Sequence, residues 1–178
     1  MEKKVFRVGS VGIGGISRGV HLPGIHKSPD LELVAVCDLK PERMEYARNT
    51  YGIRGDHCFA DYHDLIACPD VDVIDISTSN NAHFEVAKAA IEAGKPFCLE
   101  KPVTLTAEEA DILAKAAQEK GIPNMVCFSY RFKAAARYAK ELVEKGMLGD
   151  IYHVYMQYLQ GGGGPSYDLP RSWRYQKK

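Results

Sequence analysis

Short apolar runs alternate along this chain with longer mixed segments that often end in glycine. The apolar runs are nearly continuous, which is typical of parallel strands covered by helices on both faces of a sheet. The mixed segments carry helical signals, such as a proline in the first turn or a glycine after the last. We predict strands at 5–11, 31–38, 71–77, 96–99 and 124–128, and helices at 41–51, 62–67, 82–93, 106–120 and 132–145. This alternation predicts a doubly wound parallel α/β sheet whose strand-to-helix turns share one edge.

The first apolar run leads into a glycine-rich turn, Gly12-Ile13-Gly14-Gly15-Ile16-Ser17. Gly12 permits a tight turn, and Gly14 lets the backbone come close to a pyrophosphate because it has no Cβ. The last position of the turn is serine, where the dinucleotide-binding fingerprint prefers glycine or alanine. The helix that follows presents free N–H groups to phosphates, and we expect Gly19 and Pro23 to interrupt it.

Asp38 ends the second strand, about 24 residues after Gly14, where this fold places a carboxylate that binds the adenosine ribose. Its charge would repel a 2′-phosphate, so we predict NAD as the cofactor and consider NADP less favoured. Lys40 and Arg43 are nearby cations that could soften this preference. The alternative role for Asp38 is that of a helix N-cap.

A polar loop follows the strand at 71–77. The hydroxyls of Ser77 and Thr78 and the amide of Asn80 can line a cofactor groove at this edge. The alternative is a capped loop in which Asn80 or Asn81 serves as the helix N-cap. His83 fits a residue at the start of a helix better than a catalytic base.

The triplet Glu100-Lys101-Pro102 places a charged pair at the end of a buried strand. We expect Lys101 to be partly removed from water, which lowers the pKa of a lysine, while Glu100 opposes that shift. Such a lysine can hold a substrate hydroxyl and help to move its proton. The alternative is a local ion pair followed by a turn proline.

Composition narrows the class of protein. The 178 residues carry a formal net charge of +0 and no basic stripe, so we expect no nucleic-acid partner. No apolar run is long enough for a membrane helix, and the amino terminus lacks the pattern of a signal peptide. The five cysteines and six histidines are scattered without metal-ligand spacing. We predict a reduced, cytoplasmic protein with no metal site, in which Cys37, Cys98 and Cys127 act as small core residues.

The pattern changes at Asp150. A tyrosine-rich run at 151–159 predicts a strand with no helix behind it, and four glycines follow at 161–164. A single strand cannot cover its own apolar face, so this segment indicates the start of an antiparallel α+β substrate domain. We therefore predict a nucleotide-binding domain over 1–129 and part of a substrate or oligomerisation domain over 130–178.

These segments together resemble the oxidoreductases grouped with glucose–fructose oxidoreductase, inositol dehydrogenase and MocA. The resemblance is carried in order by Gly12–Ser17, Ala35–Asp38 with Arg43, Ser77–His83, Glu100–Pro102 and Tyr130–Phe132. It implies an amino-terminal Rossmann domain and a carboxyl-terminal open-faced sheet domain that binds substrate.

The resemblance also implies roles for individual residues. Lys101 corresponds to the catalytic and ribose-contacting lysine, and Arg131 faces the nicotinamide or the substrate. Trp173 and Arg174 resemble residues of a substrate-side loop, and a cis peptide often precedes the proline at position 102. The implied cofactor-binding residues are Gly12, Ile13, Gly14, Gly15, Ile16, Ser17, Asp38, Leu39, Arg43, Ser77, Thr78, Asn80, His83, Glu100, Lys101, Pro102 and Arg131.

The implied function is transfer of a hydride between a nicotinamide cofactor and a sugar, polyol or cyclitol hydroxyl. Family members are roughly twice as long, and their catalytic Asp and His lie beyond position 178. We therefore expect an amino-terminal fragment that binds cofactor with little turnover, from a protein that is a homo-oligomer at full length. One alternative is a same-fold enzyme for other substrates, such as a biliverdin or imine reductase or an NAD-dependent glycosidase. The other is a non-catalytic NAD-binding regulatory module.

Overall fold

The computed structural model describes residues 4–159 of the chain. Residue contacts divide the chain into two units, Met1–Phe132 and Lys133–Lys178. The first unit contains all the strands of the described residues, and the second begins with the last predicted helix. No helix in the described part combines the length and the apolar character needed to cross a bilayer.

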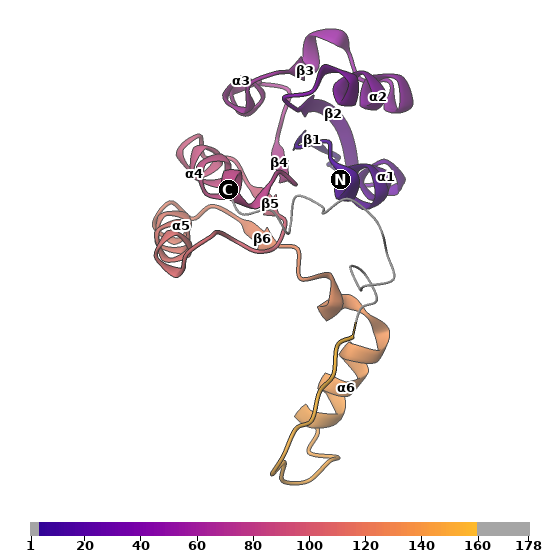
Figure 1. Ribbon diagram of the computed structural model, residues 1–178, viewed down its shortest axis with the longest axis vertical. Helices are drawn as coiled ribbons and strands as arrows, with labels where there is room; N and C mark the ends of the chain where they lie inside the picture. Colours follow the sequence, from indigo (N-terminus) through magenta and orange to yellow (C-terminus); the bar gives the residue numbers. More distant parts are fainter. Residues whose placement is uncertain (1–3, 160–178) are drawn as a thin grey trace, which may run out of the picture. The chain divides into compact units, whose positions relative to one another are not determined.

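The first unit is built on a six-stranded parallel sheet (Figure 1). Its strands are β1 (Phe6–Val11), β2 (Leu31–Cys37), β3 (Cys58–Phe59), β4 (Val73–Ile76), β5 (Phe97–Leu99) and β6 (Asn124–Val126). Their order is β3-β2-β1-β4-β5-β6, and every neighbouring pair is parallel. The direction of strand order switches between β1 and β4, where open α/β sheets form a ligand crevice. The predicted doubly wound α/β fold is confirmed.

Helices cover both faces of this sheet. They are α1 (Leu22–Lys27), α2 (Pro41–Tyr51), α3 (Tyr62–Ala67), α4 (His83–Glu92) and α5 (Ala107–Glu119), with short turns η1 (Ser17–His21), η2 (Gly55–His57), η3 (Asn80–Ala82) and η4 (Ser129–Phe132). Figure 1 shows α3, α4 and α5 on one side of the sheet and α1 and α2 on the other. Two hydrophobic cores result. Leu65, Ile76 and Leu99 belong to the larger core, and Leu22 and Val36 to the smaller one.

The helix after the glycine turn is interrupted, as predicted. It begins as the π-helical turn η1, in which the N–H of Leu22 donates to the carbonyl of Ser17. The chain then continues as α1, with Pro23 in its first turn, where the missing N–H costs no intrahelical hydrogen bond. The break therefore falls between the two positions that were expected to cause it, Gly19 and Pro23.

Two helices have the predicted bounds, and one strand was not predicted. Both α2 and α3 match the expected ranges, and Gly52 ends α2 in the left-handed region at φ 73°. Its N–H donates to the carbonyl of Arg48, which is the usual role of a glycine after a helix. The sequence did not indicate β3, because a two-residue strand is too short to show a periodic pattern.

In the second unit the structure describes residues 133–159. The helix α6 (Ala134–Glu144) forms close to its predicted bounds. The strand predicted at 151–159 is absent from the described residues, which make no ladder in this segment. A strand needs a hydrogen-bonded neighbour, and the described part of this unit offers none, so the tyrosine-rich pattern alone did not produce one. Trp173 and Arg174 lie outside the described residues.

Candidate functional site

Polar and glycine residues follow the strands at one edge of the sheet in the first unit. Because the strands are parallel, the residue after each of them lies at the same carboxyl edge. Gly12 follows β1, Asp38 follows β2, Ser77 follows β4 and Glu100 follows β5. Four segments that are far apart in the sequence are thereby brought to one edge.

Gly12 is required by the packing of the turn against the loop after β4. Its φ is 91°, and a Cβ built there would lie 2.7 Å from the carbonyl oxygen of Ser77. The N–H of Gly12 donates to the carbonyl of Cys37 at 2.8 Å, and the Ser77 hydroxyl donates to the carbonyl of Gly12 at 2.8 Å. Ser77 therefore holds the turn in place in two ways: its hydroxyl binds the Gly12 carbonyl, and its backbone packs against Gly12.

Gly14 and Gly15 differ from Gly12. A Cβ built at either position would meet no protein atom within 4 Å, and neither residue has a positive φ. Their absent side chains therefore leave open space at the start of the following helix. Such a turn fits an anion because backbone N–H groups and the positive end of the helix face the same space.

Ile13 and Ser17 are both buried beneath this turn. The hydroxyl of Ser17 has no hydrogen-bond partner among the described residues, whereas Ile16 is exposed. A buried hydroxyl without a partner costs stability. The serine side chain is nevertheless small enough for a position at which the fingerprint prefers glycine or alanine.

Asp38 is held at the glycine turn rather than at a helix cap. Its carboxylate accepts hydrogen bonds from the backbone N–H of Ile13 at 2.8 Å and of Lys40 at 2.9 Å. The N-cap of α2 is Lys40, so the alternative of an N-cap role for Asp38 is wrong. The guanidinium of Arg43 lies 3.3 Å from the carboxylate, and Leu39 beside it is 89% exposed. A carboxylate has about four acceptor sites, and Ile13, Lys40 and Arg43 occupy three of them, so Asp38 retains about one for a ribose hydroxyl.

The loop after β4 is tied to its surroundings by His83. This residue begins α4, as predicted, and is 1% exposed. Its Nδ1 lies 2.7 Å from the carbonyl of Pro102, and its Nε2 lies 3.3 Å from the carbonyl of Thr78. The imidazole thus joins the loop after β4 to the loop after β5.

The predicted asparagine cap of α4 is wrong. The N-cap of α4 is Ala82 and has no side-chain cap, because the 3₁₀ turn η3 lies between the loop and the helix. Asn80 begins that turn, and the amide oxygen of Asn81 accepts a hydrogen bond from the Ser79 hydroxyl.

The surroundings of Glu100 and Lys101 differ from those that the sequence suggested. One carboxylate oxygen of Glu100 lies 3.2 Å from Nε2 of His21, and the other accepts the backbone N–H of Lys101 at 3.0 Å. The Lys101 side chain is exposed, so the expectation that this chain removes it from water is not met. The peptide between Lys101 and Pro102 is cis, as the resemblance implied.

His21 is a site residue that sequence reasoning missed. Its Nδ1 lies 2.7 Å from Asp75, whose other oxygen accepts the Ser10 hydroxyl at 2.7 Å. Burial disfavours the charged imidazole, but the hydrogen bond and charge of Asp75 and the hydrogen bond of Glu100 outweigh it and raise the pKa of His21 to about 9. The available signal was Asp75, a carboxylate in the middle of an apolar run, because a buried charge needs a partner.

Arg131 lies in η4, at the end of the first unit. It is exposed, and its guanidinium lies 5.9 Å from the centre of the Phe128 ring. The structure therefore places this predicted nicotinamide- or substrate-facing residue after β6, the edge strand.

Two groups of three side chains in the described residues are close enough to share a cation. One consists of His21, Glu100 and Cys127, and the other of His57, Cys68 and Asp70. In each group the histidine already contacts a carboxylate. In the second group the Asp70 carboxylate also pairs with the guanidinium of Arg7 at 3.0 Å, and the positive charge of Arg7 opposes a bound cation. The absence of a metal site stays a prediction.

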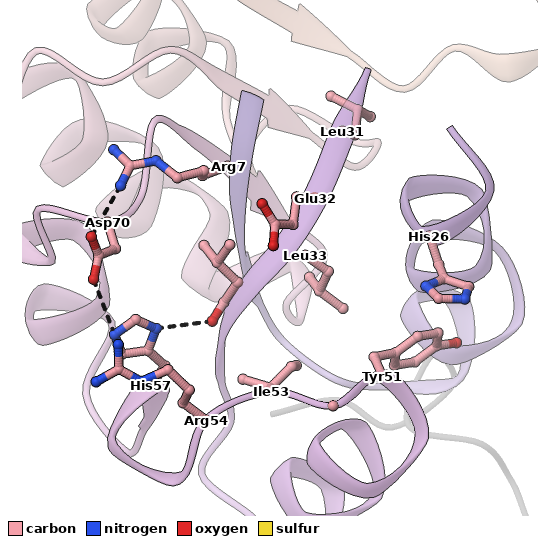
Figure 2. Close-up of a pocket in the computed structure, with 12 residues that line it drawn as sticks. Arg7, His26, Leu31, Glu32, Leu33, Tyr51, Ile53, Arg54, His57 and Asp70 are labelled. Atoms are coloured by element: carbon pink, nitrogen blue, oxygen red, sulfur yellow. Dashed lines mark hydrogen bonds and ion pairs between the residues drawn. The ribbon is translucent and has the colours of Figure 1, made fainter. Parts of the chain in front are cut away.

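A cavity of about 510 Å³ lies at another part of the sheet. Figure 2 shows Arg7 and Leu31, at the starts of β1 and β2, on its wall together with Tyr51 and His57. Residues that begin parallel strands lie at the amino edge, opposite the glycine turn. The candidate cofactor site is therefore distinct from this cavity.

Comparison with known proteins agrees with the geometry of the carboxyl edge. Residues 6–128 match a family described as oxidoreductases with an NAD-binding Rossmann fold, named for glucose–fructose oxidoreductase, inositol dehydrogenase and MocA. The chain belongs to this family. The family assignment, the fold class and NAD as the family's cofactor are thereby confirmed.

The similar proteins include several dehydrogenases. Levoglucosan dehydrogenase from Pseudarthrobacter phenanthrenivorans is 37% identical over 142 residues, which cover 80% of this chain and 36% of that protein. Inositol 2-dehydrogenase from Salmonella typhimurium is 33% identical over 168 residues, which cover 93% of this chain and 49% of that protein. The structure of scyllo-inositol dehydrogenase from Lactobacillus casei with bound NAD(H) and scyllo-inositol superposes with a TM-score of 0.78. It is 28% identical, and the match covers 83% of this chain and 43% of that one. The chain thus spans about half or less of the length of these relatives.

Proposed function

We propose that this chain is the cofactor-binding part of an NAD-dependent dehydrogenase that oxidises a hydroxyl of a sugar, polyol or cyclitol. The observation that carries the proposal is the convergence of the glycine turn, Asp38 and the Glu100–Pro102 triplet at one sheet edge. The relatives that are named for levoglucosan and inositol support the substrate class.

The residues present fit a dinucleotide. Gly14 and Gly15 leave open space where a pyrophosphate can approach the backbone, and Asp38 keeps a carboxylate beside the same turn. We infer that the turn holds the pyrophosphate and Asp38 the adenosine ribose, with Leu39 available to the adenine. Thr78 and Asn80 contribute the polar wall on the other side of β1.

The charges around Asp38 favour NAD over NADP. Its side chain is 6% exposed and stands where a 2′-phosphate would have to approach. Arg43 is the cation that could attract such a phosphate, but it lies 3.3 Å from Asp38 and is engaged there. An arginine that already neutralises a carboxylate offers less attraction to a second anion.

Lys101 is the residue that we assign to the chemistry. Its exposed ammonium can hold the substrate hydroxyl and take part in moving its proton. The adjacent Glu100 is fixed by His21, which in turn is fixed by Asp75, so the triplet is held from behind by a buried network. A bound nicotinamide supplies the hydride acceptor. The oxidised product is then a carbonyl at the former carbinol carbon.

The first test is a calorimetric titration of the chain with NAD and, separately, with NADP. We expect NAD to bind at least about tenfold more tightly, equivalent to about 1.4 kcal/mol. In Asp38→Ala the affinity for NAD should fall and the preference over NADP should shrink, because the ribose acceptor and the repelling charge are both gone.

A matched control is Asp56→Ala, which removes an exposed carboxylate that pairs with Arg54. This variant should bind NAD like the unchanged chain. Thermal melts of all three proteins separate loss of binding from loss of folding. A folded chain that binds neither dinucleotide, or an Asp38→Ala variant with unaltered NAD affinity, would contradict the proposal.

A further inference from the structure

Two cysteine thiols lie side by side at the carboxyl edge of β5 and β6. The sulfur atoms of Cys98 and Cys127 are 3.1 Å apart, a distance at which one thiol donates a hydrogen bond to the other. Neither residue belongs to the hydrophobic cores, and both are half-buried. Their predicted role as small core residues is therefore wrong, whereas Cys37 is buried in the core as predicted.

Strand register explains why these two cysteines meet. In β5, Phe97 and Leu99 enter the larger core, so Cys98 points to the opposite face of the sheet. Its register partner in β6 is Met125, and Cys127 lies two residues further on, where side chains return to the same face. The N–H of Cys127 donates to the carbonyl of Leu99 at 2.8 Å, which continues the strand pairing to this point.

The same register places the thiols in a polar row. Ser10, Asp75 and Cys98 are successive partners across β1, β4 and β5. The row ends at His21 and Glu100, whose polar atoms lie within 4.8 Å of the Cys127 sulfur. The two thiols thus differ in environment, because the Cys127 sulfur lies beside the His21 imidazole and the Glu100 carboxylate.

This asymmetry divides the chemistry between the sulfurs. The hydrogen bond from Cys98 and the charge of His21 lower the pKa of Cys127, although burial opposes this. The same hydrogen bond and burial raise the pKa of Cys98. The nucleophile in thiol oxidation is the thiolate, and the Cys127 sulfur is the one that lies beside the His21 imidazole, so we assign Cys127 as the attacking sulfur and Cys98 as the resolving one.

We propose that Cys98 and Cys127 form a redox-active pair that a hydroperoxide converts into an intramolecular disulfide. The Cys127 thiolate attacks one peroxide oxygen, the O–O bond breaks, and an alcohol or water leaves with the cysteine as a sulfenic acid. The Cys98 sulfur then attacks the Cys127 sulfur, the S–O bond breaks, and water leaves. In total two thiols lose two electrons and two protons, and the peroxide is reduced by two electrons.

The disulfide would link β5, two residues before Glu100, to the residue that follows β6. It would also remove the thiolate that faces His21. The pair therefore stands directly behind the Glu100-Lys101-Pro102 triplet, and the proposal stands on the thiol geometry whether or not the chain is a dehydrogenase.

Peptide mapping of the unaltered chain tests the pair directly. The chain is treated with one equivalent of hydrogen peroxide in the presence of a chelator, alkylated at low pH and digested with trypsin. Trypsin cuts after Lys88, Lys115, Lys120 and Arg131 but not before proline, so residues 89–115 and 121–131 are separate peptides with one cysteine each. We expect these two peptides to be joined, with the loss of two hydrogen atoms, and to release both alkylatable thiols after reduction.

Variants and a denatured control sharpen the result. Cys127→Ser should abolish peroxide consumption at the pair, whereas Cys98→Ser should leave a sulfenic acid at Cys127 that dimedone traps. Cys58→Ser is the matched control and should form the joined peptide as the unaltered chain does. In denaturant the selectivity for this pair should disappear. The proposal is overturned if the native chain gives no joined peptide. It is also overturned if Cys98 and Cys127 form a disulfide with each other no more often than either forms one with Cys37, Cys58 or Cys68.

Discussion

Gly12 and Gly14 lie in the same turn and serve different purposes. At Gly12 the backbone has a positive φ and touches the loop after β4, so the absence of a side chain is a folding requirement. At Gly14 a methyl group would meet no protein atom, so its absence matters only to a molecule that enters from outside. The sequence fingerprint requires glycine at both positions and does not distinguish a folding requirement from a binding requirement.

Alanine at the two positions should therefore have opposite consequences. We expect Gly12→Ala to lower the free energy of unfolding by at least about 1–2 kcal/mol, from the left-handed backbone alone. Gly14→Ala should leave stability within about 0.5 kcal/mol and weaken NAD binding about tenfold. Urea unfolding and calorimetry on both variants measure the two effects. Equal loss of stability at both positions would contradict the assignment.

His21 makes stability depend on pH through its two carboxylate partners. Its pKa in the folded protein, about 9, is higher than the ordinary value of 6.5. The charged form therefore stabilises the fold fully below about pH 6.5, and the contribution is lost as pH rises through 9. The difference between the two pKa values corresponds to roughly 3 kcal/mol of unfolding free energy.

We expect the stability advantage of the unaltered chain over His21→Gln to be largest near pH 6 and to shrink by about that amount by pH 10. Unfolding curves across this range, with an NMR titration of the His21 ring, measure it. His153→Gln, a change at an exposed histidine of the second unit, should follow the unaltered chain within about 0.5 kcal/mol. A His21 midpoint near 6.5 would refute the network.

At the scale of elements, the start of α5 shows how far local signals reach. The sequence has Thr106 and Glu109 in the spacing of a capping box, and the Thr106 hydroxyl accepts the N–H of Glu109 at 3.2 Å. The Glu109 carboxylate reaches the N–H of Leu105 at 3.1 Å, one residue before the usual partner. The first half of the capping box therefore forms, and the second is displaced by one residue.

Removing this cap should affect stability without affecting the cofactor. We expect Thr106→Ala to lower the free energy of unfolding by about 1 kcal/mol, since an N-cap hydroxyl satisfies a free backbone N–H. NAD affinity should not change. Thr50→Ala, an exposed change in the last turn of α2, should stay within about 0.5 kcal/mol. Urea unfolding of both variants distinguishes a cap effect from a general effect of losing a threonine.

Elements with strong local signals were predicted best. Pro41 and Gly52 bound α2, and the predicted and observed helices coincide. A signal that depended on a neighbouring segment failed at 151–159, where a tyrosine-rich run formed no strand in the described residues. Helices satisfy their hydrogen bonds internally, whereas a strand depends on a second segment.

At the scale of the whole molecule, the chain matches about half or less of the dehydrogenases that it resembles. The resemblance placed the catalytic Asp and His partners of Lys101 beyond position 178. We therefore expect a polypeptide of these 178 residues to bind NAD while producing almost no NADH from inositol or levoglucosan. Absorbance at the NADH band over many turnovers measures this. Sustained multiple turnover would show that Lys101 needs no such partners.

The sequence by itself determined the alternation of strands and helices, the glycine turn, and the residues that follow each strand. These features are local, because apolar runs, capping residues and glycines act within a few positions of themselves. From them follow the fold class and the edge at which Asp38 and Lys101 lie. Only the tertiary structure decided that His21 bridges Asp75 and Glu100 and that Cys98 meets Cys127. Those contacts depend on strand order and register, which bring together residues separated by 29 to 79 positions in the chain.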